Sequence, residues 1–392
     1  MKRIFAAVFF LIPVLGSCDF SGVDEPFVDS EPVLLDDVAR MLSCLPVGEE
    51  QMREVHDAVC ASVSNGYDEE YMMKDLFADP GAGVGDAQST RASAASSYSL
   101  PMRSLIEDYL TGQASTKGSS PAEDADRYIS ALCSSSTQIY WPFSEDWDGS
   151  SLPVVTFDPK SNATVNVGYE IVCGPDGERS VREVSVDEQM ARERPVWVVN
   201  TNDDSAYTSL ELLRRADPDW GGGGSVVVKS SAEGDVRSLV LKTFRANRNF
   251  DSWFGGASEF FVKCGSVDGF TASTEAEMKL YSPTVTDFMI VVKRKQIGED
   301  VPFNAILISD WTSQLENFAF LVTEDDGGTR TSWDFEATVK VQSKSYGITL
   351  EIPYNEKDDI VWRGSLSSRY LEKYLGSAQH FGDVDITFDV LE

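Results

Sequence analysis

The sequence predicts an α+β protein with a helical first part and a β-sandwich as its last part. Apolar residues recur at helical spacing over 32–136, whereas beyond residue 137 they fall at alternate positions, as in strands. A run of glycines at 221–224 separates a small β-rich region, 137–220, from a longer strand-rich region, 225–392. The chain has 392 residues and is 42% hydrophobic, which allows about two packed domains.

A helical hairpin is predicted at the start of the helical region. Leu35, Val38 and Leu42 recur at helical spacing, a Pro-Val-Gly sequence at 46–48 interrupts the pattern, and the same spacing then resumes. Residues 81–99 are nearly all Gly, Ala and Ser, which predicts a flexible loop. Further helices are predicted over 68–78, 102–110 and 123–132.

Strands are predicted from alternating apolar residues in the rest of the chain. In the small β-rich region they cover 138–143, 152–157, 165–172, 180–186 and 195–200, with a hairpin turn at 174–177. The last region carries eight predicted strands, which are enough for two packed sheets. They cover 239–244, 259–262, 288–292, 305–308, 318–322, 335–341, 346–352 and 384–390.

The first 18 residues predict export and a lipid anchor. Lys2 and Arg3 precede a short apolar run at 4–14, which is well below the roughly 20 residues of a membrane-spanning helix, so we expect 1–17 to be removed as a signal peptide. The Leu-Gly-Ser-Cys sequence that ends at Cys18 resembles the lipobox of bacterial lipoproteins. This resemblance implies that Cys18 becomes the N-terminus and carries acyl chains. The alternative is an ordinary secretory signal that ends before Cys18.

Residues 18–31 are acidic and predict a tether between the lipid and the folded body. Within them, Asp24-Glu25 resembles the acidic export signal of surface-exposed lipoproteins in Bacteroidota. The chain as a whole resembles uncharacterised lipoproteins of Bacteroidales through 139–143, 195–200 and 253–263. These resemblances imply a place in the cell envelope, anchored to the outer membrane. They leave open the periplasmic or the surface face, and they imply no activity.

The charge of the chain is strongly negative. The formal net charge is −31, and removal of Lys2 and Arg3 with the signal peptide makes it −33. Such an excess repels phosphate backbones, so nucleic acid is not an expected partner, whereas divalent cations are compatible with it. We therefore expect the N-terminal lipid to be the only contact with the membrane. Whether the partner is a protein or a glycan is left open.

The cysteines other than Cys18 number five, so at least one is unpaired. Cys44 and Cys60 have a spacing that suits a disulfide. In the predicted hairpin, however, Cys60 lies more than ten residues beyond the turn, and the rise of about 1.5 Å per helical residue puts it too far away to bridge.

The region 226–392 resembles the C-two module of synaptotagmin and protein kinase C, which binds calcium on acidic loops. In 244–263 an apolar strand leads to Asp251 and then to a Ser-Glu-Phe-Phe-Val-Lys sequence that contains Glu259. Two later acidic segments, 323–328 and 358–364, are similar to the module's other loop. The resemblance implies a calcium site whose candidate ligands are Asp251, Glu259, Asp325, Asp326, Asp358 and Asp359.

The order of the acidic segments departs from that family and bears on whether both later acidic pairs can lie near Asp251. A predicted hairpin at 333–352 separates them, so either the strand order differs or only one pair lies near Asp251. Ca²⁺ prefers six to eight oxygen ligands at about 2.4 Å, and clustered carboxylates provide them. The alternative is that these acidic turns are solvated without a cation.

Enzymatic chemistry has little support in the sequence. His56 and His380 are the only histidines, and no metalloprotease, nucleotide-binding or hydrolase-elbow motif occurs. Acidic pairs such as Glu145-Asp146 and the pair at 203–204 could cleave glycosides, but carboxylates are abundant here. The basic run 293–295 indicates either a phosphate contact or a solvated strand end.

We therefore predict a non-enzymatic lipoprotein that acts as a binding or structural module and is stabilised by calcium. Two alternatives stay open. One is a secreted hydrolase with an atypical carboxylate site, for which we expect a deep pocket with two carboxylates. The other is a surface adhesin or assembly subunit, for which we expect a long unpaired edge strand.

Overall fold

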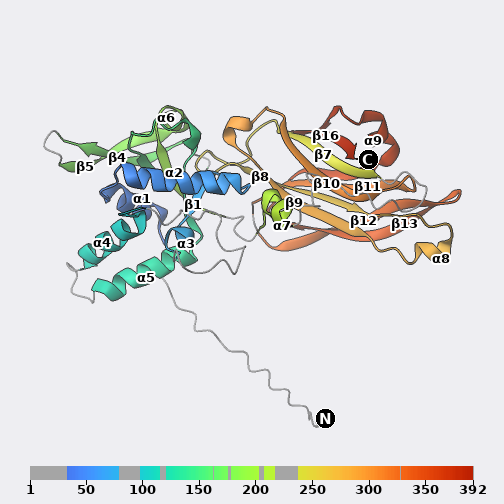
Figure 1. Ribbon diagram of the computed structural model, residues 1–392, viewed down its shortest axis with the longest axis horizontal. Coiled ribbons are helices and arrows are strands. Elements are labelled where there is room, and N and C mark those ends of the chain that lie inside the picture. The colour runs from blue at the N-terminus through green and yellow to red at the C-terminus, as the bar shows by residue number, and fades with distance from the viewer. Residues whose placement is uncertain are drawn as a thin grey trace, which may run out of the picture. The chain divides into compact units, whose positions relative to one another are not determined.

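The computed structural model describes residues 33–78, 98–114, 121–161, 163–174, 178–202, 207–216, 237–326 and 328–391. Over these residues the chain is an α+β protein with a large β portion, arranged in three mostly antiparallel sheets (Figure 1). Below, 33–216 is called the N-terminal region and 237–391 the C-terminal region. The signal peptide, the tether with Cys18, most of the loop 81–99, the turn at 175–177 and the boundary at 221–224 lie outside the described residues.

One six-stranded sheet forms the centre of the N-terminal region, in the order β1-β2-β6-β3-β4-β5. Its only parallel pair within the described residues is β3 with β6. The alternation of apolar residues along β6 places Val196 and Val198 on one face of the sheet and Trp197 and Val199 on the other. Both faces are therefore apolar at the sheet centre, and both must be covered. The strands are β1 Glu70–Met72, β2 Thr137–Tyr140, β3 Val154–Phe157, β4 Val165–Cys173, β5 Arg179–Asp187 and β6 Val196–Thr201.

Helices cover the first face of this sheet. The predicted hairpin is present as α1 and α2, and Val38, Leu42, Val55 and Val59 are fully buried in a core shared with Trp197. Glu54 of α2 accepts a hydrogen bond from the first backbone N–H of α4, at 2.6 Å, and so caps that helix. The bounds are α1 Leu35–Cys44, α2 Glu49–Ser64, α3 Met73–Leu76, α4 Met102–Ala114 and α5 Pro121–Ser134.

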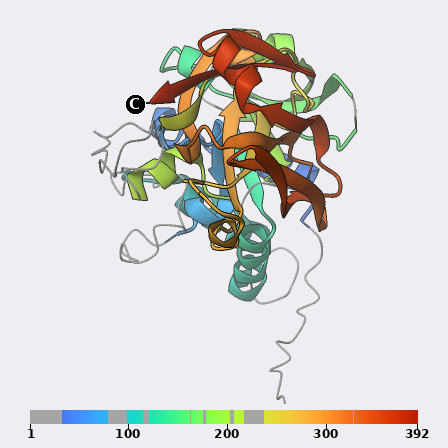
Figure 2. The same cartoon turned by 90° about the vertical axis from the view of Figure 1, so that its right-hand side faces the viewer.

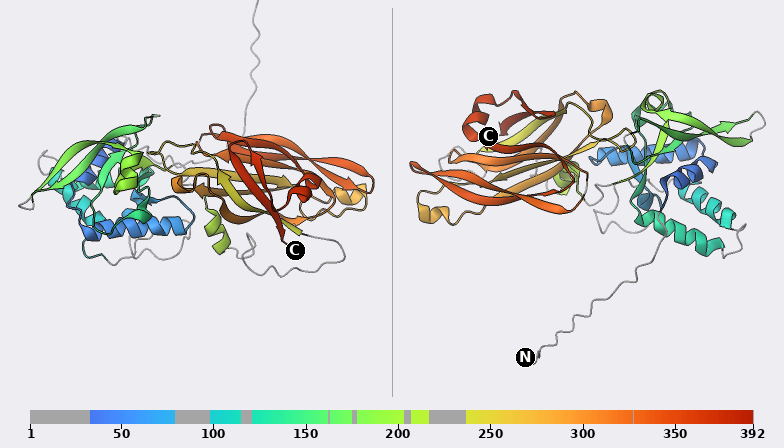
Figure 3. Two further views of the ribbon diagram at one scale, coloured as in Figure 1. Left: turned by 90° about the horizontal axis from the view of Figure 1, so that it is seen from above. Right: turned by 180° about the vertical axis from the view of Figure 1, so that it is seen from behind.

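The C-terminal region consists of two antiparallel sheets whose inner faces share one hydrophobic core. The first has the order β10-β7-β16-β15, and the second β13-β12-β11-β8-β9 with β14 on β11. Figure 2 views this region from its far end, with its orange-to-red strands in front, and Figure 3 shows β16 beside β7. Its ten described strands are β7 Arg237–Ala246, β8 Ser258–Ser266, β9 Thr284–Val292, β10 Val301–Trp311, β11 Leu315–Glu324, β12 Arg330–Val341, β13 Lys344–Asn355, β14 Asp359–Ser367, β15 Ala378–Phe381 and β16 Val384–Leu391.

Several predicted elements differ from the structure. Eight of these ten strands follow the predicted ranges, but β14 and β15 were not predicted, so a count of eight is wrong for this region. In β14 Leu366 is the one buried residue, which weakens the alternation, and β15 has only four residues. The segment 68–78 was predicted as one helix, but it begins as β1 because Glu70–Met72 pairs with β2.

Four further helices and the cysteines complete the description. The helices α6 Glu188–Glu193, α7 Leu210–Ala216, α8 Glu275–Met278 and α9 Ser368–Tyr374 were not predicted, and Asp187 caps α6 through a 2.9 Å hydrogen bond from Met190 N. The cysteines that the structure describes are all unpaired, Cys44 and Cys60 among them. Among the residues described, no helix combines the length and the apolar character needed to cross a bilayer.

The second face of the N-terminal sheet is covered by the C-terminal region. The segment 250–257, called the junction loop, connects β7 to β8 and carries Trp253 and Phe254. Both rings pack against Tyr140, Val196 and Val198, and Phe254 is fully buried. Trp253 Nε1 also donates a 3.0 Å hydrogen bond to the carbonyl of Thr164. The two regions are therefore joined through one continuous apolar core.

We expect Phe254→Ala to lower the free energy of unfolding by about 3–5 kcal/mol, because it leaves a cavity at this core. Denaturant unfolding followed by circular dichroism measures the change. Leu280, which is 82% exposed, provides the control, since Leu280→Ala should change stability by no more than about 0.5 kcal/mol. Equal effects of the two substitutions would contradict the packing described for the junction loop.

Candidate functional site

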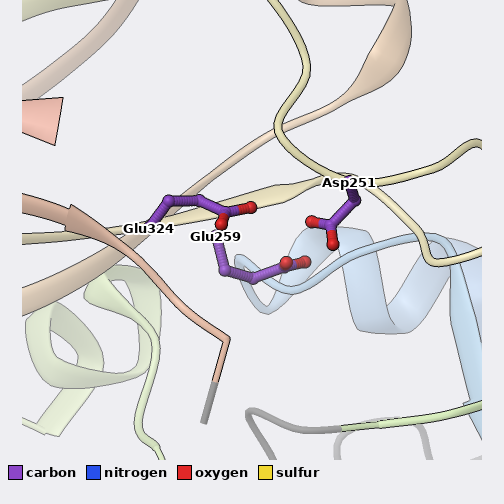
Figure 4. A group of neighbouring side chains, drawn as sticks. All are labelled: Asp251, Glu259 and Glu324. Carbon is purple, nitrogen blue, oxygen red and sulfur yellow. The ribbon is translucent and has the colours of Figure 1, made fainter. Parts of the chain in front are cut away.

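Three carboxylates converge where the junction loop meets the C-terminal sheet. Asp251 belongs to the junction loop, Glu259 to β8 and Glu324 to the end of β11. Figure 4 shows their carboxyl groups pointing toward one another, and one oxygen from each lies within 4.8 Å of the others. This group is called the acidic triad. Glu324 is 1% exposed and Glu259 is 9% exposed, so the charges are largely withdrawn from water.

Burial favours the protonated forms of Asp251 and Glu324. Burial raises the pKa of Asp251, the hydrogen bond with Glu324 lowers it, and the nearby Asp326 raises it. Burial is also the largest cause of a raised pKa at Glu324, followed by the charge of Asp251, with which Glu324 is in hydrogen-bond contact. In the absence of a cation, the triad therefore retains protons that ordinary carboxylates release.

A pocket of about 300 Å³ opens beside Asp251 and Glu259 and is walled by both regions. We call it the junction pocket. Residues of the N-terminal region line one part of its wall and residues of the C-terminal region the other. The first group is Asp68, Glu70, Gln138, Asp158, Lys160, Ser161, Thr201 and Asn202, and the second is Phe250, Asp251, Ser252, Gly255, Glu259 and Asp326.

The alternation of the N-terminal strands explains this lining. Tyr140 and Gln138 point to the same face of β2, and Asn200 and Asn202 continue the face of Val196 and Val198 along β6. The apolar face that receives the junction loop thus becomes polar at one end. Asn200 Nδ2 donates to the carbonyls of Phe254 at 3.0 Å and Gly255 at 2.5 Å, which fixes the loop at the pocket edge.

Further hydrogen bonds hold the junction loop from both regions. Asp68 Oδ2 accepts from the backbone N–H of Ala257 at 2.9 Å. Arg294 Nη1 donates to the carbonyls of Ser252 and Gly256, at 3.2 Å each. The backbone that follows Asp251 is thereby held by both regions, and the Asp251 carboxylate does not need to hold the loop itself.

The basic run 293–295 pairs with acidic residues of the N-terminal region. Lys293 Nζ lies 3.8 Å from Glu69, Arg294 Nη2 lies 3.5 Å from Glu188, and Lys295 Nζ lies 2.9 Å from Asp146. Lys293 and Arg294 are therefore largely buried in ion pairs, whereas Lys295 is half exposed and paired at the surface. They join the two regions beside the junction loop.

The structure brings together some of the predicted calcium ligands. Asp251 and Glu259 both belong to the triad, and Asp326 lines the same pocket. Asp359 begins β14, directly opposite Glu324 on β11, because β14 rather than the β12–β13 hairpin takes this edge of β11. The strand order therefore allows both later acidic segments to approach Asp251.

Asp325 and Asp358 have other contacts. Asp358 Oδ2 accepts hydrogen bonds from Asn355 N at 3.0 Å and Thr323 Oγ1 at 3.3 Å, so it holds the turn before β14. Asp325 donates its backbone N–H to the carbonyl of Glu259 at 3.0 Å and lies near the Asn355 amide. These two side chains are not members of the triad.

No local sequence pattern predicts Glu324, Gln138 or Asn202 as site residues. Glu324 stands directly before the predicted Asp325–Asp326 pair, and only the strand register shows that it, rather than Asp325, faces Asp251. Continued alternation along β2 and β6 is the signal that could have indicated Gln138 and Asn202. Nothing in the local sequence indicates that these strands face the junction loop.

The arrangement suits a hard divalent cation. Three carboxylates supply up to six oxygens, within the coordination range of Ca²⁺, and Asp326 is close enough to raise the pKa of both Asp251 and Glu324. A bound cation would replace the retained protons and remove the repulsion between the carboxylates.

In metal-free buffer, we expect the free energy of unfolding to fall as the pH rises from 5 to 8. Asp251 and Glu324 have raised pKa values in the folded chain, so the folded state holds more protons than the unfolded state over this range. Glu324→Gln should make the slope shallower by about 1 kcal/mol per pH unit. Urea unfolding at several pH values measures this.

The control for this experiment is Glu351→Gln, which changes an exposed glutamate on β13 and should leave the slope as it is. A wild-type stability that rises with pH over the same range would show that the triad is ionised in the folded chain.

The acidic triad and the junction pocket thus combine side chains from five strands and several loops of both regions. The triad supplies oxygen ligands, and the pocket supplies a polar cavity beside them. Comparisons with protein-family models, with curated proteins and with solved structures find no match to this chain.

Proposed function

We propose that this chain is a lipid-anchored protein of the cell envelope whose body is a binding module stabilised by calcium. The observation that carries the binding role is the convergence of Asp251, Glu259 and Glu324 beside a pocket that both regions line. The anchor rests on the lipobox-like sequence that ends at Cys18. The outer membrane is the proposed location, a protein or glycan the proposed kind of partner, and the net charge of −31 disfavours nucleic acid.

We further propose that the C-terminal region is a sandwich of the C-two kind. Two antiparallel sheets around one core support this, as does the position of Asp251 and Glu259 at one end of β8. The ten described strands and the long β12–β13 hairpin are departures from an eight-stranded sandwich.

Calcium fits the triad better than magnesium does. Mg²⁺ requires near-ideal octahedral geometry and keeps several of its waters, whereas Ca²⁺ accepts irregular sets of six to eight oxygens. The triad carboxylates come from a loop and from two adjacent strands, and the carbonyl of Glu259 is already used by Asp325 N. Such a set is irregular and rich in carboxylate oxygens, which favours Ca²⁺.

A hydrolase is the second candidate, because the junction pocket has more than the two carboxylates expected for one. Glycosidase carboxyl pairs, however, stand about 5–5.5 Å apart in retaining enzymes and farther apart in inverting ones. The triad oxygens lie within 4.8 Å of one another, so they are placed for a shared proton or cation rather than on two sides of a sugar.

An assembly role has a weaker basis. The outer strand β5 is long and mostly exposed at the sheet edge. It carries Arg179, Arg182 and Glu183, however, and charged edge strands resist pairing with other chains.

The lipid anchor is tested by Cys18→Ser. We expect the parent chain to fractionate with membranes and to incorporate labelled palmitate in a bacterial host, and the variant to lose both properties. Cys44→Ser, which changes an exposed thiol of the folded body, is the matched control and should keep both. A parent chain without an added acyl mass would contradict the proposed anchor.

Calcium binding is tested by thermal unfolding with EDTA or with 5 mM CaCl₂. A cation that binds only the folded state stabilises it, by about 2.7 kcal/mol at one hundred times its Kd, so the Tm should rise in calcium. Glu259→Gln should abolish the rise, and Glu351→Gln should retain it. An unchanged Tm of the parent chain at millimolar calcium would exclude the calcium site.

A further inference from the structure

The part of the junction pocket formed by the N-terminal region holds two buried amides with unused oxygens. Gln138 is 4% exposed and Asn202 is 6% exposed, and both line the pocket. Gln138 Oε1 and Asn202 Oδ1 have no hydrogen-bond partner among the described residues. Asn202 Nδ2 donates to Glu70 Oε2 at 2.8 Å, which fixes the amide orientation and leaves its oxygen for another donor.

These oxygens cost stability unless a ligand satisfies them. A buried acceptor without a partner loses its hydrogen bonds to water on folding and gains none in return. Two such acceptors lie in one pocket, on neighbouring strands β2 and β6, so one ligand placed there could satisfy both. Since both unused atoms are acceptors, the missing group must supply donors.

The charge of the pocket selects the kind of donor. Its wall contains six carboxylates, and Lys160 is the one base among the described lining residues. A calcium ion at the triad would bring two positive charges, which is less than the triad's own three carboxylates carry. A neutral polyol would leave this excess in place, and an anion would add to it.

Ammonium and guanidinium groups have the required chemistry. An ammonium offers three donors and a guanidinium five, neither has an acceptor, and both are positively charged. The pocket volume of about 300 Å³ is at the lower end of the range for small-molecule sites. Phe250 also lines the pocket and offers an apolar surface to the alkyl part of such a ligand, while the Arg248 guanidinium already lies over its ring, 3.7 Å from the centroid.

We propose that the junction pocket binds a small organic cation, an ammonium or guanidinium group, through Gln138 Oε1, Asn202 Oδ1 and the surrounding carboxylates. This inference rests on the proposed function, because it names a ligand for the binding module. It does not require bound calcium, since the amide oxygens and the carboxylates of Asp68, Glu70 and Asp158 lie outside the triad. The cation comes either from a free amine or from a lysine or arginine side chain of a peptide.

Calorimetric titration of the full mature chain in detergent and 0.15 M NaCl tests the proposal. The probes are putrescine, methylguanidinium, an acetylated and amidated Gly-Arg-Gly peptide, and the neutral isostere methylurea. We expect at least one cationic probe to bind with a Kd below 1 mM and methylurea not to bind. Binding of the peptide alone indicates a peptide ligand, and binding of the small cations indicates a free amine.

Gln138→Met tests the amide itself. It keeps the size of the side chain and removes the unused oxygen, so we expect the affinity to fall tenfold or more while the Tm stays the same or rises. Gln379→Met is the matched control, because Gln379 is also buried with an unused Oε1 but lies on β15, outside the pocket. It should leave the affinity unchanged.

Two further variants separate this proposal from the others. Asp158→Asn removes a charge from a partly exposed pocket residue and should weaken binding at least threefold, even if Gln138→Met fails to fold. Glu324→Gln should abolish the calcium-induced rise in Tm and retain organic-cation binding within about threefold. The proposal is overturned if no cationic probe binds at 10 mM, or if Gln138→Met binds as the parent does. Absence of the calcium-induced rise in Tm alone contradicts the calcium site and does not contradict the organic-cation site.

Discussion

The structure depends on the packing of the junction loop against the second face of the N-terminal sheet. That sheet is apolar on both sides at its centre, and the helices α1 and α2 cover only the side that carries Trp197. Trp253 and Phe254, more than fifty residues later in the chain, cover the other side. Without them, Val196, Val198 and Tyr140 would be exposed to water, so the N-terminal region is not expected to be stable by itself.

The same loop explains why an acidic site exists beside this core. Asp251 precedes Trp253 by two residues, so packing of the aromatic side chains carries its carboxylate toward Glu259 and Glu324. The energy of apolar burial at the junction can offset the cost of withdrawing these carboxylates from water. Arg294 binds the loop carbonyls instead of the triad oxygens, and the repulsion is therefore left for protons or a cation to relieve.

Local patterns in the sequence predicted most helices and strands, but they did not predict which segments pair or pack with one another. Helical spacing predicted α1 and α2, and alternation predicted most strands, because each pattern reports burial of one face. The helix predicted at 68–78 failed because pairing of Glu70–Met72 with β2 is a long-range contact. For the site, Asp251 and Glu259 were expected from the resemblance of 244–263 to a C-two calcium loop. Glu324 and the amides of Gln138 and Asn202 depend on the register of β11 with β8 and on which face of β2 and β6 meets the junction loop.

A site built in this way links binding to the cohesion of the whole body. The triad residues belong to the C-terminal region and the amides to the N-terminal region. The pocket therefore exists only while the packing of Trp253 and Phe254 keeps the two regions in contact. Any ligand that binds both walls therefore stabilises the junction by an amount that grows with the ratio of its concentration to its Kd, since separation of the regions destroys its site. The ion pairs of Lys293, Arg294 and Lys295 act on the same contact but are exposed to different degrees, so salt weakens them unequally. Apolar packing thus stabilises the junction under all these conditions. Protonation, cation binding and ionic strength raise or lower the stability of the junction around that contribution.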